Sequence, residues 1–166
     1  MPKKIIILSD NIPGHLNQSE GIAALLKTQF DCSVRLIPVV YNLHFFRSFI
    51  TFLGRHLCKS ITPFKARFIN SFYQNIEVNH ADLIIAAGGN TAPLAAALRI
   101  INSVPLIQLG SPRGLSPDLF NALVTVERYY DHPANIVVDI TPNKYSPIIC
   151  SQASHSQNMQ QHLLFL

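Results

Sequence analysis

Three short segments place glycine beside polar side chains where an apolar run ends and a helix or turn should begin. They are residues 13–18 (PGHLNQ), 88–91 (GGNT) and 111–114 (SPRG). Glycine lets a backbone turn tightly or approach a ligand closely. Free N–H groups at the start of a helix favour an anion. Because ligands of open α/β sheets bind beyond the carboxyl ends of the strands, the three segments predict one ligand-binding edge.

The first segment offers the most varied chemistry. Gly14 supplies backbone freedom, and the side chains of His15, Asn17 and Gln18 supply hydrogen-bond donors and acceptors. We expect these four residues to contact a ligand. Their spacing fits neither the Gly-x-Gly-x-x-Gly dinucleotide fingerprint nor a P-loop. An ordinary turn with a surface histidine is the alternative, and the residues alone leave both interpretations open.

The second segment joins a buried strand to the start of a helix. We favour ligand contact by Gly88, Gly89 and Asn90, because this segment should lie beside the first one. Helix capping by Asn90 or Thr91 is the alternative.

Two later segments add charged groups. Arg113, which follows Pro112, is predicted to clamp a phosphate or a carboxylate, with a solvated turn as the alternative. Asp131 and His132 have the chemistry of an oriented acid–base pair. A turn before Pro133 is the interpretation that we favour for them.

Other chemistries have no motif in this chain. Neither His-Glu-x-x-His, nor Gly-x-Ser-x-Gly, nor a Cys/His cluster occurs, so we expect no metal and no cofactor and identify no catalytic nucleophile. The cysteines are Cys32, Cys58 and Cys150, which are odd in number and far apart. This pattern favours neither a disulfide framework nor zinc, and we expect a reducing, cytoplasmic compartment.

Alternating apolar runs and helical patterns must position these segments. Residues 10–18 are expected to form a loop, and Asn17 or Ser19 should cap the helix that follows. That helix should place four apolar residues on one face: Ile22, Leu25, Leu26 and Phe30. Two helices split near residues 62–63 and one over 92–101 are also predicted. Strands are expected at 4–9, 33–40, 82–87, 104–109, 122–126 and 136–139. The result is an α/β class: a Rossmann-like, doubly wound, mainly parallel sheet.

Residues 43–69 combine phenylalanine-rich faces with positive charge. No acidic residue occurs between Asp31 and Glu77, whereas six basic residues do: Arg35, Arg47, Arg55, Lys59, Lys65 and Arg67. Such a segment can contact an anionic membrane surface from the cytoplasm. Packing of the phenylalanines into the core is the interpretation that we favour slightly. Nucleic acid is not expected as a partner, because the aromatics form no RNA-binding motif.

The end of the chain differs from the rest. Between residues 151 and 161, nine of the eleven residues are Ser, Gln, His or Asn. We therefore expect a Rossmann-like domain over 1–148 and a polar, disordered tail over 149–166.

Four stretches resemble the mitochondrial-fission "elongated mitochondria" family, which has many bacterial members. They are residues 13–21 (PGHLNQSEG), 82–94 (DLIIAAGGNTAPL), 108–113 (QLGSPR) and 130–136 (YDHPANI). Their order and spacing are similar to the N-terminal half of that family, over residues 4 to 147. The resemblance implies the N-terminal domain of a GT-B glycosyltransferase fold, which holds the acceptor while a C-terminal domain holds a nucleotide sugar.

The resemblance also assigns places to the residues above. It implies that Gly14, His15, Asn17 and Gln18 line the cleft, and that Gly88, Gly89, Asn90, Pro112, Arg113, Asp131 and His132 stand nearby. In the family an arginine commonly follows the glycine of the second motif, where this chain has Gly89 and Asn90.

The expected function follows from that resemblance. We expect a truncated, acceptor-side domain that binds a sugar or lipid-linked acceptor. Hexosyl transfer from a nucleotide sugar would need the C-terminal domain as a partner. A non-enzymatic, membrane-peripheral adaptor and an inactive remnant are the alternatives.

Overall fold

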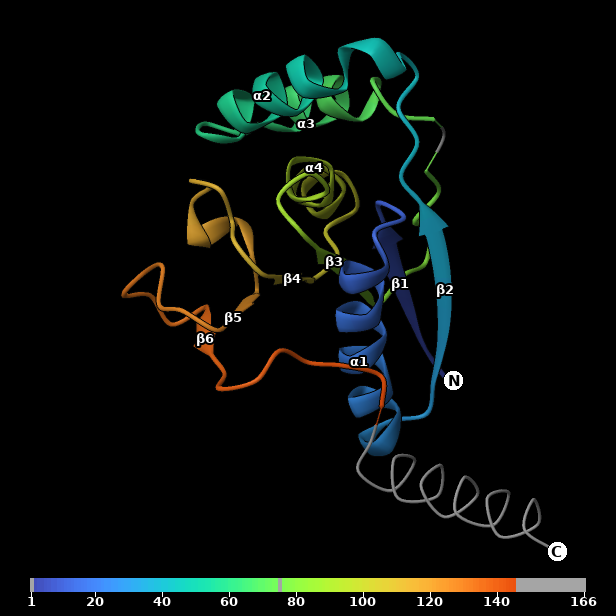
Figure 1. Ribbon diagram of the computed structural model, residues 1–166. Coiled ribbons are helices and arrows are strands. Elements are labelled where there is room, and N and C mark those ends of the chain that lie inside the picture. The colour runs from blue at the N-terminus through green and yellow to red at the C-terminus, as the bar shows by residue number, and fades with distance from the viewer. Residues whose placement is uncertain (1, 75, 146–166) are drawn as a thin grey trace, which may run out of the picture.

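A single parallel sheet organises the part of the chain that the computed structural model describes, residues 2–74 and 76–145 (Figure 1). All pairings between neighbouring strands are parallel, in the order β2-β1-β3-β4-β5-β6. The strands are β1 (Lys3–Ser9), β2 (Cys32–Pro38), β3 (Leu83–Ala87), β4 (Leu106–Leu109), β5 (Ala122–Thr125) and β6 (Asn135–Val137). This confirms the predicted Rossmann-like, doubly wound class.

Helices cover both faces of the sheet, which is why its central strands are continuously apolar. One face carries α1, and the other carries α4, with α2 and α3 packed on the outer side of α4 (Figure 1). The helices are α1 (Pro13–Gln29), α2 (Arg47–Cys58), α3 (Pro63–Asn70) and α4 (Ala92–Asn102), with short 3₁₀ turns η1 (His44–Phe46) and η2 (Pro117–Leu119). The predicted split near residues 62–63 is confirmed.

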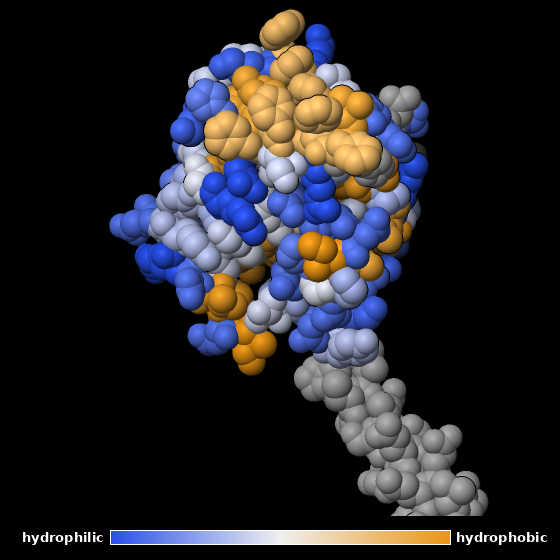
Figure 2. Space-filling model, turned by 45° about the horizontal axis from the view of Figure 1, so that its top comes forward, coloured by the Kyte–Doolittle hydropathy of each residue, from blue (hydrophilic) through white to orange (hydrophobic). Residues whose placement is uncertain are grey.

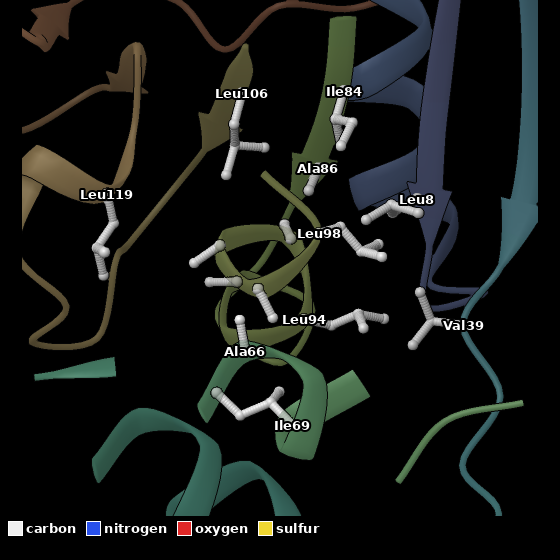
Figure 3. Close-up of a cluster of buried hydrophobic side chains, with 14 of the residues drawn as sticks. Leu8, Val39, Ala66, Ile69, Ile84, Ala86, Leu94, Leu98, Leu106 and Leu119 are labelled. Carbon is white, nitrogen blue, oxygen red and sulfur yellow. The ribbon is translucent and has the colours of Figure 1, made fainter. Parts of the chain in front are cut away.

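The larger core lies between the sheet and α4 (Figure 3). Leu94 and Leu98 of α4 are completely buried against sheet residues that include Ile84 and Leu106. Four alanines of α4 are also buried, and small residues let α3 approach it closely through Ala66. The apolar, alanine-rich sequence of α4 therefore makes it a central rather than a surface helix.

The start of α1 corrects one prediction. The helix begins at Pro13, so Gly14, His15, Asn17 and Gln18 lie in its first turns instead of in a loop. Proline favours the first helical position, where its fixed φ fits and its missing N–H has no partner to lose. The predicted capping by Asn17 or Ser19 was also wrong, because both residues lie inside the helix. The residue before the helix is Ile12, which makes no side-chain cap.

The buried side of α1 differs from the predicted one too. Leu25 and Phe30 are exposed, and Phe30 lies just beyond the helix. The fully buried residues are small: Ser19, Gly21 and Ala23. Small side chains let a helix lie close to its neighbours, and hydrophobic spacing alone does not reveal such a face.

Most of the phenylalanines in residues 43–69 do not pack into the core, which overturns the interpretation favoured from the sequence. The inner sides of α2 and α3 are already filled by other residues, so the rings point outward. The exposed apolar side chains are Leu43, Phe45, Phe46, Phe49, Phe52, Phe64 and Phe68. The predicted tail at 149–166 and Cys150 lie outside the described residues.

Candidate functional site at the carboxyl edge of the sheet

The strand order changes direction between β1 and β3. The chain leaves β1 toward β2 on one side, and it leaves β3 toward β4 on the other. The connections therefore diverge above these neighbouring strands, which is where open α/β sheets bind ligands. Residues 10–15, 88–91 and 110–114 all follow the carboxyl ends of β1, β3 and β4.

His15 is held by a carboxylate at this edge. Its Nδ1 lies 2.9 Å from Oδ2 and 3.1 Å from Oδ1 of Asp10. The Asp10 side chain is only 5% exposed, whereas that of His15 is 30% exposed. A carboxylate can only accept, so Nδ1 donates, and Nε2 of the neutral ring is an acceptor. The sequence prediction included His15 and missed Asp10, which follows a buried strand directly.

The turn Gly88–Gly89 is enclosed by two side chains from other segments. A Cβ added at Gly88, where φ is +82°, would collide with the ring of His15. A Cβ at Gly89 would lie 2.5 Å from Cγ and Cδ of Arg113. The buried Gln108 amide donates to the Gly88 carbonyl oxygen at 3.1 Å and holds the turn from below. Residues predicted from three separate segments are thus in contact.

A second arginine reaches the same turn from α2. Nη2 of Arg55 donates to the carbonyl oxygen of Gly89 at 3.5 Å, while its buried Nε has no hydrogen-bond partner among the described residues. Burial lowers the pKa of Arg55, and the positive charge of Arg113 lowers it further. An arginine still stays protonated at neutral pH. The side chains of Arg55 and Arg113 therefore both contact the Gly88–Gly89 turn.

Neither guanidinium forms an ion pair with a carboxylate within residues 2–74 and 76–145. Like charges held close together repel, and a bound anion removes that repulsion. The arrangement is suited to a phosphate or a carboxylate, which guanidinium groups bind through paired hydrogen bonds. Arg55 was predicted only as part of the basic segment. A signal was available, because it stands four residues after Thr51 and three before Cys58, both on the buried side of α2.

The other residues of the first segment are placed less centrally. Gly14 is exposed in the first turn of α1, so neither a tight turn nor a close backbone approach requires it. Oδ1 of Asn17 accepts a hydrogen bond from the backbone N–H of Lys144 at 3.3 Å. Gln18 lines a small pocket of about 90 Å³ beside Leu109 and residues 124–126.

Asn90 and Pro112 flank the central group. Asn90 is half-buried just before α4, and Pro112 is buried next to Arg113. Thr91 does not cap α4 by accepting from its N–H groups; its hydroxyl donates to the carbonyl oxygens of Ala87 and Gly88.

Asp131 and His132 are not brought to this edge. They precede β6, at its amino end, in a turn before residues 133–134, as the favoured interpretation had it. Nε2 of His132 lies 3.2 Å from Oδ1 of Asp118, and Asp131 pairs with Arg128 at 3.3 Å. The two residues therefore do not form an acid–base pair with each other.

Two further findings concern the residues that the structure describes. They contain no group of three or more His, Cys, Asp or Glu side chains that could hold a metal ion. None of their helices combines the length and the apolar character that crossing a bilayer requires.

Sheet order, helical layers and the diverging edge together define a Rossmann-like α/β domain, a class in which ligands generally bind at the topological switch point. The chain belongs to the mitochondrial fission ELM1 family, whose model matches residues 13–152. The match includes all the carboxyl-edge segments from 13 onward and confirms the resemblance noted in the sequence. Comparison with curated proteins gives no match.

Proposed function

We propose that this chain is the acceptor-side domain of a GT-B glycosyltransferase-like protein. Its carboxyl edge binds the anionic group, a phosphate or a carboxylate, of a sugar or lipid-linked acceptor. The observation that carries the proposal is the approach of Arg55 and Arg113 to the Gly88–Gly89 turn without a carboxylate partner among the described residues.

The neighbouring histidine supports a sugar as the rest of the ligand. Asp10 fixes the ring of His15 and leaves Nε2 as an acceptor. A hydroxyl of the ligand can donate to that nitrogen while the guanidinium groups bind its anionic group. This division of roles explains why the site combines a histidine–carboxylate pair with two arginines.

The proposal is for binding, not for transfer by this domain alone. In a GT-B arrangement the nucleotide sugar is held by a C-terminal domain that faces this edge. The His15–Asp10 pair would then lie on the acceptor side of the cleft.

A non-enzymatic, membrane-peripheral adaptor is the second candidate. The exposed phenylalanines of α2 and α3 favour it, because an adaptor needs a contact surface and no sugar site. The two candidates differ in whether the carboxyl edge binds a small anion.

Calorimetric titration with inorganic pyrophosphate and with glucose 1-phosphate tests the proposal. We expect binding to the wild-type chain and a loss of about tenfold or more in affinity for Arg113→Gln, because a hydrogen bond to a charged group contributes about 1.5–3 kcal/mol. Arg55→Gln should weaken binding in the same direction.

Arg99→Gln is the matched control. Arg99 binds Asn121 and the carbonyl oxygen of Asp118, away from the carboxyl edge, and its loss should leave the affinity unchanged. Absence of binding by the wild-type chain, or equal losses in all three variants, would contradict the proposal and favour the adaptor.

A further inference from the structure

The outer surface of α2 and α3, with η1, is apolar to a degree unusual for a protein surface. We call it the aromatic face and define it by Leu43, Phe45, Phe46, Phe49, Phe52, Phe64 and Phe68. The face appears as one continuous hydrophobic area in Figure 2. Phe45 is fully exposed, Phe64 is 79% exposed and Phe52 is 66% exposed. Since one aromatic side chain covers about 150–250 Å², the seven residues present several hundred Å² of apolar surface.

The fold holds these rings outward. Phe49 and Phe52 stand at i and i+3 in α2 and therefore share one side of that helix, and Phe45 precedes them in η1. The opposite side of α2 packs on α4, where a Cβ built on Gly54 would lie 2.9 Å from Cβ of Pro93. In α3 the inner side is filled by Ala66. The helices cannot rotate to bury the rings without losing these close contacts.

Positive charge accompanies the aromatic face. Arg47, Lys59 and Arg67 are exposed in or beside the two helices, and no acidic residue occurs between Asp31 and Glu77. None of the three forms an ion pair within the described residues. Their charges are thus available to an anionic partner, and the segment contains no carboxylate that would repel one.

The composition of the face separates a lipid surface from a protein partner. The energetic hot spots of protein interfaces are enriched in tryptophan, tyrosine and arginine, and leucine is under-represented among them. The aromatic face consists of phenylalanine and leucine with a single sign of charge around it, which matches helices lying in the interface of an anionic bilayer. We propose that the aromatic face docks on an anionic lipid bilayer, with the phenylalanine rings inserted and Arg47, Lys59 and Arg67 against the lipid phosphates.

This proposal concerns other residues than the proposed acceptor site and does not rest on that site. The two surfaces are nevertheless adjacent, because Arg55 of α2 contacts Gly89 of the carboxyl edge. Docking therefore positions the carboxyl edge beside the lipid surface.

Vesicle flotation with the full chain tests the proposal. The vesicles consist of phosphatidylcholine alone or of phosphatidylcholine with phosphatidylglycerol. We expect the chain to float with the anionic vesicles and much less with the neutral ones, and added salt should reduce the difference.

Two pairs of variants make the test specific. Phe49→Ser with Phe52→Ser should lower partitioning by about tenfold or more, whereas Leu25→Ser with Phe30→Ser, which are also exposed, should not change it. Lys59→Gln with Arg67→Gln should lower it by about fivefold per removed charge. Circular dichroism verifies that each variant is folded.

Several outcomes would overturn the proposal. They are no flotation, equal flotation with both vesicle types, and unchanged flotation of the phenylalanine variant. Another is a protein that remains in solution as a dimer and becomes monomeric in that variant, because the aromatic face would then bind a second copy of the chain.

Discussion

The outer side of α1 is covered by another part of the chain, whereas the aromatic face of α2 and α3 is not covered by any of the described residues. The chain itself crosses α1, as its last described segment shows in Figure 1. The backbone of Asn143 packs on Gly21, Nζ of Lys144 pairs with Glu20 at 3.1 Å, and Asn17 accepts from the Lys144 N–H. The aromatic face has no such cover among residues 2–74 and 76–145. The chain thus covers α1 itself, whereas the aromatic face of α2 and α3 remains exposed and can contact an external surface.

The difference also separates two kinds of exposed apolar residue. Leu25 and Phe30 stand on and just after α1 near charged neighbours such as Lys27, and isolated residues of this kind need no explanation. The phenylalanines of α2 and α3 are contiguous, and a contiguous patch indicates a contact.

The largest effect is expected on the free energy of unfolding, when a buried residue of the helical layer formed by α2, α3 and α4 is compared with an exposed one. Leu94→Ala should lower the free energy of unfolding by about 2–5 kcal/mol, because it opens a cavity in the core between α4 and the sheet. Phe52→Ala should change it by less than about 0.5 kcal/mol, as surface substitutions do. Urea denaturation measures both. If Phe52→Ala lowered the free energy of unfolding nearly as much as Leu94→Ala, the ring would contribute to folding and not to a contact surface.

A smaller effect is expected where the chain crosses α1. Gly21→Ala places a Cβ 2.6 Å from backbone atoms of Asn143, so the crossing segment must shift at a cost of about 1–3 kcal/mol. Gly14→Ala, in the same helix, meets no atom within 4 Å and should not destabilise the protein. Thermal unfolding compares the two. Equal stability of both variants would mean that the segment does not cover α1 closely.

Much of the fold was predictable because its central strands are buried on both faces. Continuous apolar runs mark β1 and β3, and proline precedes β1 while glycine follows β3. The buried side of α1 was not predictable, because it depends on small residues whose role is set by the neighbours they approach. The exposure of the phenylalanines depends likewise on α4 already being covered by Ala66 and other small residues.

The candidate site was predictable as far as it follows strand ends. Gly88, Gly89 and Arg113 were predicted from their places after β3 and β4, and the structure brings them into contact. Arg55 was assigned to another role, because its contact with Gly89 spans 34 positions of sequence. The resemblance implied that Asp131 and His132 stand near the cleft, whereas the turn that contains them lies at the amino end of β6.

Tryptophan fluorescence tests the external contact of the aromatic face most directly. The chain contains no tryptophan, so a single introduced indole reports on one position only. On addition of vesicles that contain phosphatidylglycerol, the emission of Phe52→Trp should shift to shorter wavelength, while that of Phe30→Trp stays unchanged. No shift at position 52, or equal shifts at both positions, would contradict the account.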